Sequence, residues 1–257
     1  MHEPPLILVT NDDSYLSPGI KALVEAVKDF GEVVVVAPDK PQSGMGHAIT
    51  VGNILRVHPV DRFPGIEAYG CSGTPVDCVK LAVTHLLKRR PALLVSGINH
   101  GANNSINVLY SGTMSAAVEG AMEGIPSIGF SLCNFSWEAD FQAATHYARE
   151  LVWSALNNDF PLKTCLNVNI PSIPLNEIKG IKICRQAEAY WADSYEKRQD
   201  PHGSTYFWLT GMFENRDKGE DTDVWALDHN YVSVVPVQFD MTAHHVIAQL
   251  NNWTHGE

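Results

Sequence analysis

Short, continuously apolar runs alternate with helix-like patterns through much of the chain, and this alternation constrains the fold more than any other feature. A strand that is covered by helices on both faces is apolar at every position, so such runs are typical of βαβ units around a mainly parallel sheet. The sequence therefore predicts an α/β fold with a doubly wound, Rossmann-like sheet. We expect its strands at residues 6–10, 33–37, 66–69, 92–96, 127–132 and 165–170.

The segments between these runs carry apolar residues at helical spacing. Pro18 and Pro75 stand at positions that favour the first turn of a helix. We expect helices from Pro18 to Val27, from residue 74 to 86, from 113 to 123 and from 137 to 156. A strand at residues 231–235 and a helix from about Thr242 are expected to close the chain.

Residues 185–228 have a different character, because they are rich in aromatic and charged side chains and lack a helical period. The aromatic residues in question are Tyr190, Trp191, Tyr195, Tyr206, Trp208 and Trp225. We interpret this region as a hairpin or arm that projects from the sheet, and exposed aromatic hairpins usually find a partner. The predicted organisation is a catalytic core at 1–184, a projecting oligomerisation region at 185–228, and a returning strand and helix at 229–257.

The charge and the N-terminus limit the partners that the chain can have. A formal net charge of −11 argues against a stable nucleic-acid partner, because phosphate neutralisation needs clustered Lys and Arg. The negative net charge is compatible with a small phosphorylated substrate, because one metal ion can supply local positive charge. The N-terminus lacks a basic segment followed by an apolar stretch, and no apolar run is long enough to span a bilayer. A cytoplasmic protein with no membrane partner is expected.

Polar clusters directly follow the predicted strands, and ligands of open α/β sheets bind beyond the carboxyl ends of the strands. The first cluster contains Asp12 and Asp13, adjacent carboxylates that favour a hard cation such as Mg²⁺ or Mn²⁺. A helix cap is an equally good explanation of either acid. The second cluster, residues 39–47, offers Ser43 as an oxygen ligand and Lys40 as a charge, although a surface turn is the commoner role of such a segment.

The third and fourth clusters add groups that suit phosphate. Asn99 and Asn103 follow the strand at 92–96, and amide groups can bind either a hard metal or phosphate oxygens. Residues 110–113 lead into a predicted helix, whose free N–H groups make an anion site unless Ser111 is only a cap. A cation site and an anion site at one sheet edge together indicate phosphoester chemistry.

Five stretches of the chain, taken in order, resemble the successive motifs of the SurE family of survival-protein nucleotidases. They are ILVTNDDSYLSPGI, VVAPDKPQSGMGHAIT, CSGTPVDCVKLA, LLVSGINHGANNSINVLYSGTMSAAVEG and TDVWALDHNYVSVVPVQFDMT. The resemblance implies a SurE-like fold and a nucleotidase that hydrolyses nucleoside 5'- and 3'-monophosphates, with exopolyphosphatase side activity. It also implies homodimers or homotetramers in which the projecting region exchanges between subunits.

The same resemblance implies roles for individual residues. It assigns one divalent metal ion per subunit, Mg²⁺ or Mn²⁺, to Asp12, Asp13, Ser43 and Asn99. It assigns substrate phosphate to Asn103, Ser111, Gly112 and Thr113, and catalysis to Asp12, Asp240 and His244. This chain departs from the family pattern G-x-N-x-G-x-D-V-x-Y-S-G-T at two positions, where Ser105 replaces a glycine and Asn107 replaces the aspartate.

Other functions also place acids after a first strand. A covalent phosphatase would use Asp12 as nucleophile, although that chemistry usually shows an Asp-x-Asp spacing. A non-catalytic, Mg²⁺-dependent receiver-like module would need an Asp at the end of a middle strand, where this chain has residues 96–99. A non-catalytic nucleotide-binding module usually carries G-x-G-x-x-G after strand one, and this chain does not.

Overall fold

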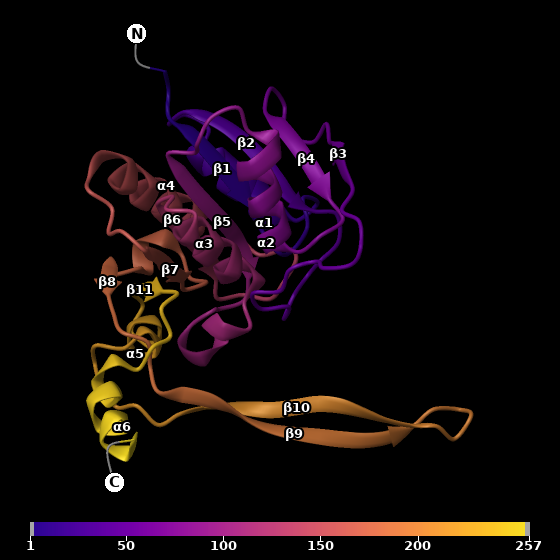
Figure 1. Cartoon of the computed structure of the whole chain (residues 1–257), viewed down its shortest axis with the longest axis vertical. Coiled ribbons are helices and arrows are strands. Elements are labelled where there is room, and N and C mark those ends of the chain that lie inside the picture. Colours follow the sequence, from indigo (N-terminus) through magenta and orange to yellow (C-terminus); the bar gives the residue numbers. More distant parts are fainter. Residues whose placement is uncertain (1–2, 255–257) are drawn as a thin grey trace.

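The computed structural model describes residues 3–254 and contains a nine-stranded sheet with helices on both faces (Figure 1). Its strand order is β3-β4-β2-β1-β5-β6-β7-β11-β8. The six strands that the sequence predicts first are β1 (Leu6–Thr10), β2 (Glu32–Pro38), β4 (Glu67–Cys71), β5 (Leu93–His100), β6 (Ser127–Leu132) and β7 (Thr164–Ile170). All five pairings among them are parallel, so the predicted α/β sheet is confirmed.

Three further strands lie toward the two ends of the sheet, and each is either short or antiparallel to a neighbour. They are β3 (Val57–Pro59), β8 (Ile181–Ile183) and β11 (Val232–Gln238). β3 pairs antiparallel with β4, and β11 pairs antiparallel with β7. Strands of three residues give no periodic signal, which explains why β3 and β8 were not predicted.

Helices and single turns connect the strands. They are α1 (Pro18–Val27), α2 (Pro75–Leu81), η1 (Ala82–Leu86), η2 (Ser105–Leu109), α3 (Gly112–Met122), α4 (Gln142–Asn157), η3 (Leu175–Glu177), α5 (Asp223–Asp228), η4 (His244–Val246) and α6 (Ile247–Thr254). Within the described residues, every helix is too short or too polar to span a bilayer.

Strand β1 illustrates why the apolar runs are continuous. Ile7 and Val9 belong to a core shared with α1 and α4, whereas Leu6 and Leu8 pack on the other face with α2 and α3. Alternate side chains of a strand point to opposite faces, so a strand covered on both sides is apolar throughout. The doubly wound arrangement follows directly.

Two predicted boundaries are wrong for identifiable reasons. Helix α4 begins at Gln142 rather than near residue 137, because the preceding segment forms local side-chain turns. There, Asn134 accepts the N–H of Ser136, and the Ser136 hydroxyl accepts the N–H of Glu138. Strand β5 continues to His100 after an irregularity between Ser96 and Asn99, which extends the strand into the polar cluster.

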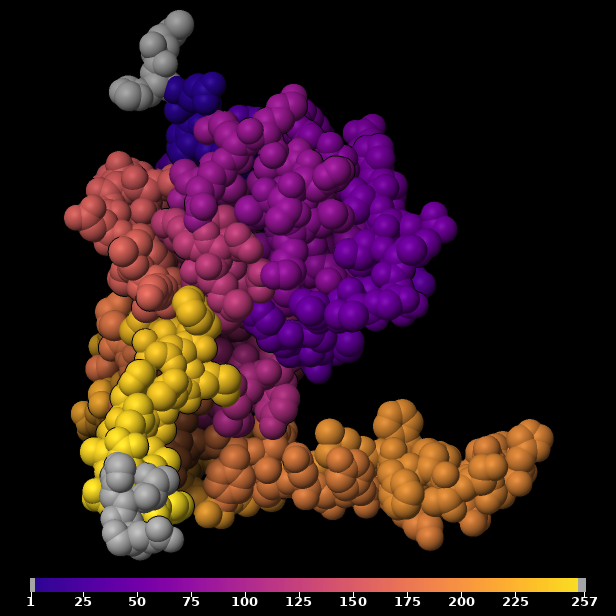
Figure 2. All heavy atoms as spheres, in the orientation of Figure 1, coloured from indigo at the N-terminus to yellow at the C-terminus, as the bar shows by residue number. Residues whose placement is uncertain are grey.

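The predicted arm is a long antiparallel hairpin formed by β9 (Ala189–Gln199) and β10 (Thr205–Asn215). Figures 1 and 2 show it extending away from the sheet, while the chain returns through α5 and β11 to the sheet edge. Most of its side chains are exposed, including Trp208 and Phe207. The division into a core, an oligomerisation region and a returning segment stays a prediction.

Candidate functional site

The loop after β1 is shaped by side chains other than its two acids. The Asn11 amide donates to the carbonyl of Ser14 at 2.9 Å and to the Ser17 hydroxyl at 3.0 Å. Ser17 is the N-cap of α1, and its hydroxyl accepts a first-turn N–H. Asp12 and Asp13 therefore do not cap this helix, and the cap explanation of the acidic pair is wrong.

Asp12 is held in a tight, buried position. Its side chain is 4% exposed and accepts a 2.5 Å hydrogen bond from the Thr113 hydroxyl. Gly112 allows this contact, because a Cβ there would lie 2.7 Å from the Asp12 Cβ. Burial and the charge of Asp13 raise the pKa of Asp12 to about 6. An ionised Asp12 is therefore costly unless a cation approaches it.

Asp13 is positioned by His100, which the sequence did not single out. One oxygen of Asp13 accepts from the His100 backbone N–H at 3.2 Å and lies 2.8 Å from its Nδ1. The imidazole stacks on Trp137 at 5.1 Å and meets the Phe141 ring edge-on. Its Nε2 is buried and has no hydrogen-bond partner among the described residues. The only local signal was its place after Asn99 at a strand end.

A cavity of about 500 Å³ opens at the carboxyl edge of the sheet. It brings together five of the predicted site residues, namely Asp12, Ser43, Asn99, Asn103 and Ser111. Asp13 does not line the cavity. It lies against His100, and His100 does line the cavity. Gly112 and Thr113 do not line it either, and the Thr113 hydroxyl donates to Asp12.

Asn103 is fixed by two buried amides that the sequence analysis missed. Its N–H donates to the Asn169 side chain at 2.7 Å, and its carbonyl accepts from the Asn167 side chain at 2.8 Å. The Asn103 amide itself donates to the Ser131 hydroxyl at 2.8 Å. Polar residues in the otherwise apolar strand β7 were the available signal. They hold the loop over the sheet edge.

Ser111 has two roles at once. It is the N-cap of α3, where its hydroxyl accepts the N–H of Met114 at 3.0 Å, and it lines the cavity. The simple cap explanation is therefore correct for this hydroxyl. The N–H groups of the first turn of α3 nevertheless form the positive end of the helix, which lies close to Asp12. Such a position favours the binding of an anion.

The structure does not bring Asp240 and His244 to the cavity of their own chain. They pair with each other, with the Asp240 carboxylate 2.9 Å from His244 Nε2, and their side chains are 49% and 68% exposed. Hydrogen bonds from Thr242 and His244 hold the pKa of Asp240 well below its usual range. Neither residue lines the wall.

The residues at the cavity fit a hard divalent cation. Among residues 3–254, no group of three His, Cys, Asp or Glu side chains is placed to hold a metal, so a site here needs hydroxyl and amide oxygens as well. In the described part of the chain, neither Asp12 nor Asp13 forms an ion pair with Lys or Arg. The Asn99 NH₂ donates to the Gly101 carbonyl at 2.8 Å, which leaves its oxygen as a ligand.

Comparisons with known proteins identify the family. The family model described as "Survival protein SurE" matches residues 7–193. The chain belongs to the SurE family. It is 60% identical to a Flavobacterium johnsoniae protein named 5'-nucleotidase SurE, covering 98% of this chain and 97% of that one. A Cytophaga hutchinsonii protein of the same name is 58% identical, with 96% of each chain covered.

A solved structure supports the same family. The SurE protein from Aquifex aeolicus superposes with a TM-score of 0.85 at 39% sequence identity, covering 97% of this chain and 100% of that one. The predicted family and the predicted α/β fold are both confirmed.

Both departures from the SurE pattern contact the base of the hairpin. Ser105 is buried with a φ of 52°, and its hydroxyl lies 2.9 and 3.0 Å from the carbonyls of Ala187 and Ala189. The Asn107 side-chain oxygen accepts from Trp191 Nε1 at 2.7 Å. These residues join η2 to β9, and Trp191 thereby becomes part of the cavity wall.

Proposed function

We propose that this SurE-family chain is a divalent-metal-dependent phosphomonoesterase that hydrolyses nucleoside 5'- and 3'-monophosphates to nucleoside and phosphate. The observation that carries the proposal is the buried Asp12, which lines the cavity beside the N-terminus of α3, with Asp13 next to it held by His100. Relatives named 5'-nucleotidase that share 58–60% of the sequence support the same activity.

One Mg²⁺ or Mn²⁺ would be held by the ligand set that the family resemblance implies, Asp12, Asp13, Ser43 and Asn99. When bound, the ion supplies Lewis acidity toward phosphate and makes hydroxide available near neutral pH. Thr113 and His100 would act as positioning residues, because each hydrogen-bonds one of the two carboxylates.

Substrate phosphate would lie between the acidic pair and the start of α3. Ser111 and Asn103 line this space, and the N–H groups of Gly112 and Thr113 belong to the first helical turn. Donors fixed by the fold stabilise charge on phosphoryl oxygens without reorganising during the reaction. The carboxylates would repel the phosphate unless a cation neutralised them, which couples substrate binding to metal binding.

Asp240 and His244 would handle a proton, as the family resemblance implies. The Asp240 carboxylate is 2.9 Å from His244 Nε2 and would orient the imidazole for proton transfer, either at the attacking water or at the leaving oxygen. Because the pair is exposed outside the cavity of its own chain, this role requires the C-terminal segment to move or to act from another copy. A homodimer or homotetramer provides that second copy.

Phosphate release from the purified chain tests the proposal. The panel contains nucleoside 5'- and 3'-monophosphates and short polyphosphate, each with Mg²⁺, with Mn²⁺ and with excess EDTA. We expect metal-dependent release from the nucleotides. Full activity in EDTA would exclude the metal mechanism, and a trapped phosphoryl group on Asp12 would replace it with covalent catalysis. Nucleotide binding without phosphate release would favour a non-catalytic binding module.

A further inference from the structure

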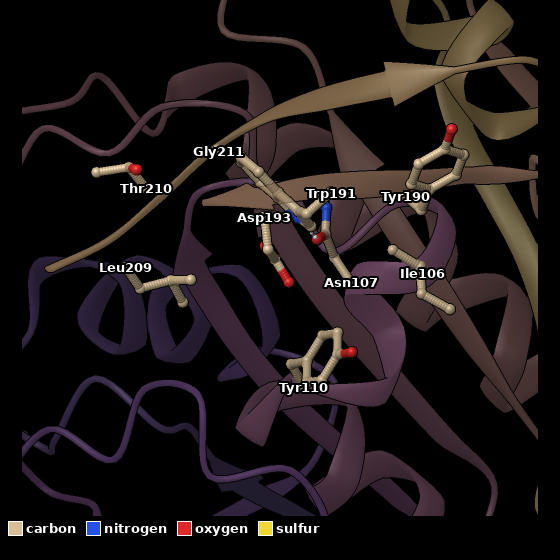
Figure 3. A pocket seen from close by; sticks show the side chains of 9 residues that line it. All are labelled: Ile106, Asn107, Tyr110, Tyr190, Trp191, Asp193, Leu209, Thr210 and Gly211. Carbon is tan, nitrogen blue, oxygen red and sulfur yellow. Dashed lines mark hydrogen bonds between the residues drawn. The ribbon is translucent and has the colours of Figure 1, made fainter. Parts of the chain in front are cut away.

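A second cavity of about 620 Å³ lies between η2 and the hairpin, directly beside the first. The two cavities share Asn107, Tyr110 and Trp191 in their walls. Figure 3 shows Tyr110 on one side of the second cavity and Trp191 with Asp193 on the other. A single ligand can therefore extend from Asp12 in the first cavity into the second.

Trp191 presents an aromatic surface that is fixed before any ligand arrives. Trp191 is 44% exposed as a residue, and it lines both cavities. The indole N–H donates to the Asn107 oxygen at 2.7 Å, and the Phe213 ring packs at 5.6 Å with an interplanar angle of 61°. A side chain restrained on two sides loses little further conformational freedom when a ligand stacks on it.

The charge of the residues that line the second cavity argues against the binding of an extended anion there. Asp193 lines it, and none of the described lining residues is Lys or Arg. A polyphosphate chain that continued from the first cavity would bring negative charge toward this carboxylate. A flat, neutral group with hydrogen-bond donors would instead stack on Trp191 and meet an acceptor at Asp193.

We propose that the second cavity binds the nucleobase of the substrate, which stacks on Trp191, and that Asn107 is a positioning residue for the indole. This inference rests on the proposed function, which places the phosphate in the first cavity. Stacking on an aromatic side chain tolerates every base, because each has a π-face. The site therefore distinguishes nucleotides from base-free phosphate esters more strongly than one base from another.

Ribose 5-phosphate carries a hydroxyl where adenosine 5'-monophosphate carries its base, so a comparison of the two substrates tests the second cavity. Trp191→Ala should raise KM for adenosine 5'-monophosphate roughly tenfold or more, the size of a lost base–aromatic stack. KM for ribose 5-phosphate should rise much less, because this substrate has no base to stack on Trp191. Trp191→Phe, which keeps an aromatic face, should retain most of the affinity for the nucleotide.

Trp208→Ala is the matched control, since Trp208 is 57% exposed on the same hairpin and lines neither cavity. This substitution should leave KM for both substrates unchanged. Asn107→Leu removes the acceptor for the indole N–H and should raise KM for the nucleotide about threefold to tenfold. Asn107→Asp keeps an acceptor and should remain closer to wild type.

Calorimetric titration with adenosine in EDTA separates this inference from the proposed function, because it needs neither metal nor catalysis. Adenosine should bind the wild-type protein and bind Trp191→Ala roughly tenfold more weakly. Equal affinities would overturn the inference, as would an equal KM increase for ribose 5-phosphate or in Trp208→Ala. Trp191-dependent adenosine binding by a protein that releases no phosphate would support the inference while the proposed function failed.

Discussion

The strand-end cluster around Asp12 and the C-terminal pair Asp240–His244 are two regions with similar chemistry and opposite surroundings. Asp12 is 4% exposed, and burial raises its pKa to about 6. Asp240 is half-exposed, and hydrogen bonds from Thr242 and His244 lower its pKa. A buried carboxylate with a raised pKa needs a cation to stay ionised, whereas an exposed one with two donors does not. The difference favours cation binding at the first region, as proposed, whereas proton handling at the second stays a prediction.

Removing the buried acid should have the largest effect on activity. We expect Asp12→Ala to lower kcat/KM for a nucleoside monophosphate at least about a thousandfold, because loss of a metal's Lewis acidity removes several kcal/mol of transition-state stabilisation. Asp61→Ala, at an exposed acid elsewhere, is the control and should be unaffected. If Asp12→Ala retained a tenth of the wild-type rate, the cluster would have no central role in the chemistry.

The metal-free protein tests the raised pKa directly. The folded-state pKa of Asp12, about 6, exceeds the usual value of 3.8, so the folded state binds the extra proton. Stability in EDTA should therefore fall as the pH rises from about 4 to above 6, by about 3 kcal/mol in total. The side chain of Asp12→Asn can still accept the hydrogen bond from Thr113, but it does not titrate. Urea denaturation of this variant at a series of pH values should therefore not show the fall in stability. An unchanged pH profile in Asp12→Asn would show that Asp12 is not the group responsible.

Substitution in the C-terminal pair Asp240–His244 should lower the activity of the protein but hardly change its stability. We expect His244→Ala to lower kcat about a hundredfold, the usual scale of general acid–base catalysis. Because the pair is exposed, the free energy of unfolding of the protein should hardly change. Mixing the two impaired variants, Asp12→Ala and His244→Ala, then tests which copy supplies the histidine. Recovered activity in the mixture indicates action across subunits, and no recovery indicates movement within one chain.

The sequence could predict those parts of the site that depend on local order along the chain. Strands β1 and β6 have the predicted ends, and the residues that follow strands meet at one edge because parallel strands share a direction. For this reason Asp12, Ser43 and Asn99 were found without a structure. The same argument could not locate Asp240–His244, since no strand direction fixes an exposed C-terminal turn.

The contacts that the sequence missed join residues far apart in the chain. His100 meets Asp13 across 87 positions, and Trp191 meets Asn107 across 84. Neither pair produces a periodic pattern, because each depends on how a loop or hairpin packs after the sheet has formed. The aromatic residues of the hairpin were correctly predicted to project, but their use as a cavity wall was not.

The smallest expected effect concerns Ser105, which connects the site to the hairpin. Ser105→Ala should destabilise the protein by about 1–3 kcal/mol, because the carbonyls of Ala187 and Ala189 lose a buried donor. Ser105→Gly loses the same donor but relaxes the left-handed backbone at φ 52°, so it should be about 1 kcal/mol more stable than the alanine variant. Urea denaturation of both variants measures the difference. Equal stabilities would mean that backbone conformation contributes nothing here, and that the hydroxyl alone explains why serine is accommodated where the family pattern has glycine.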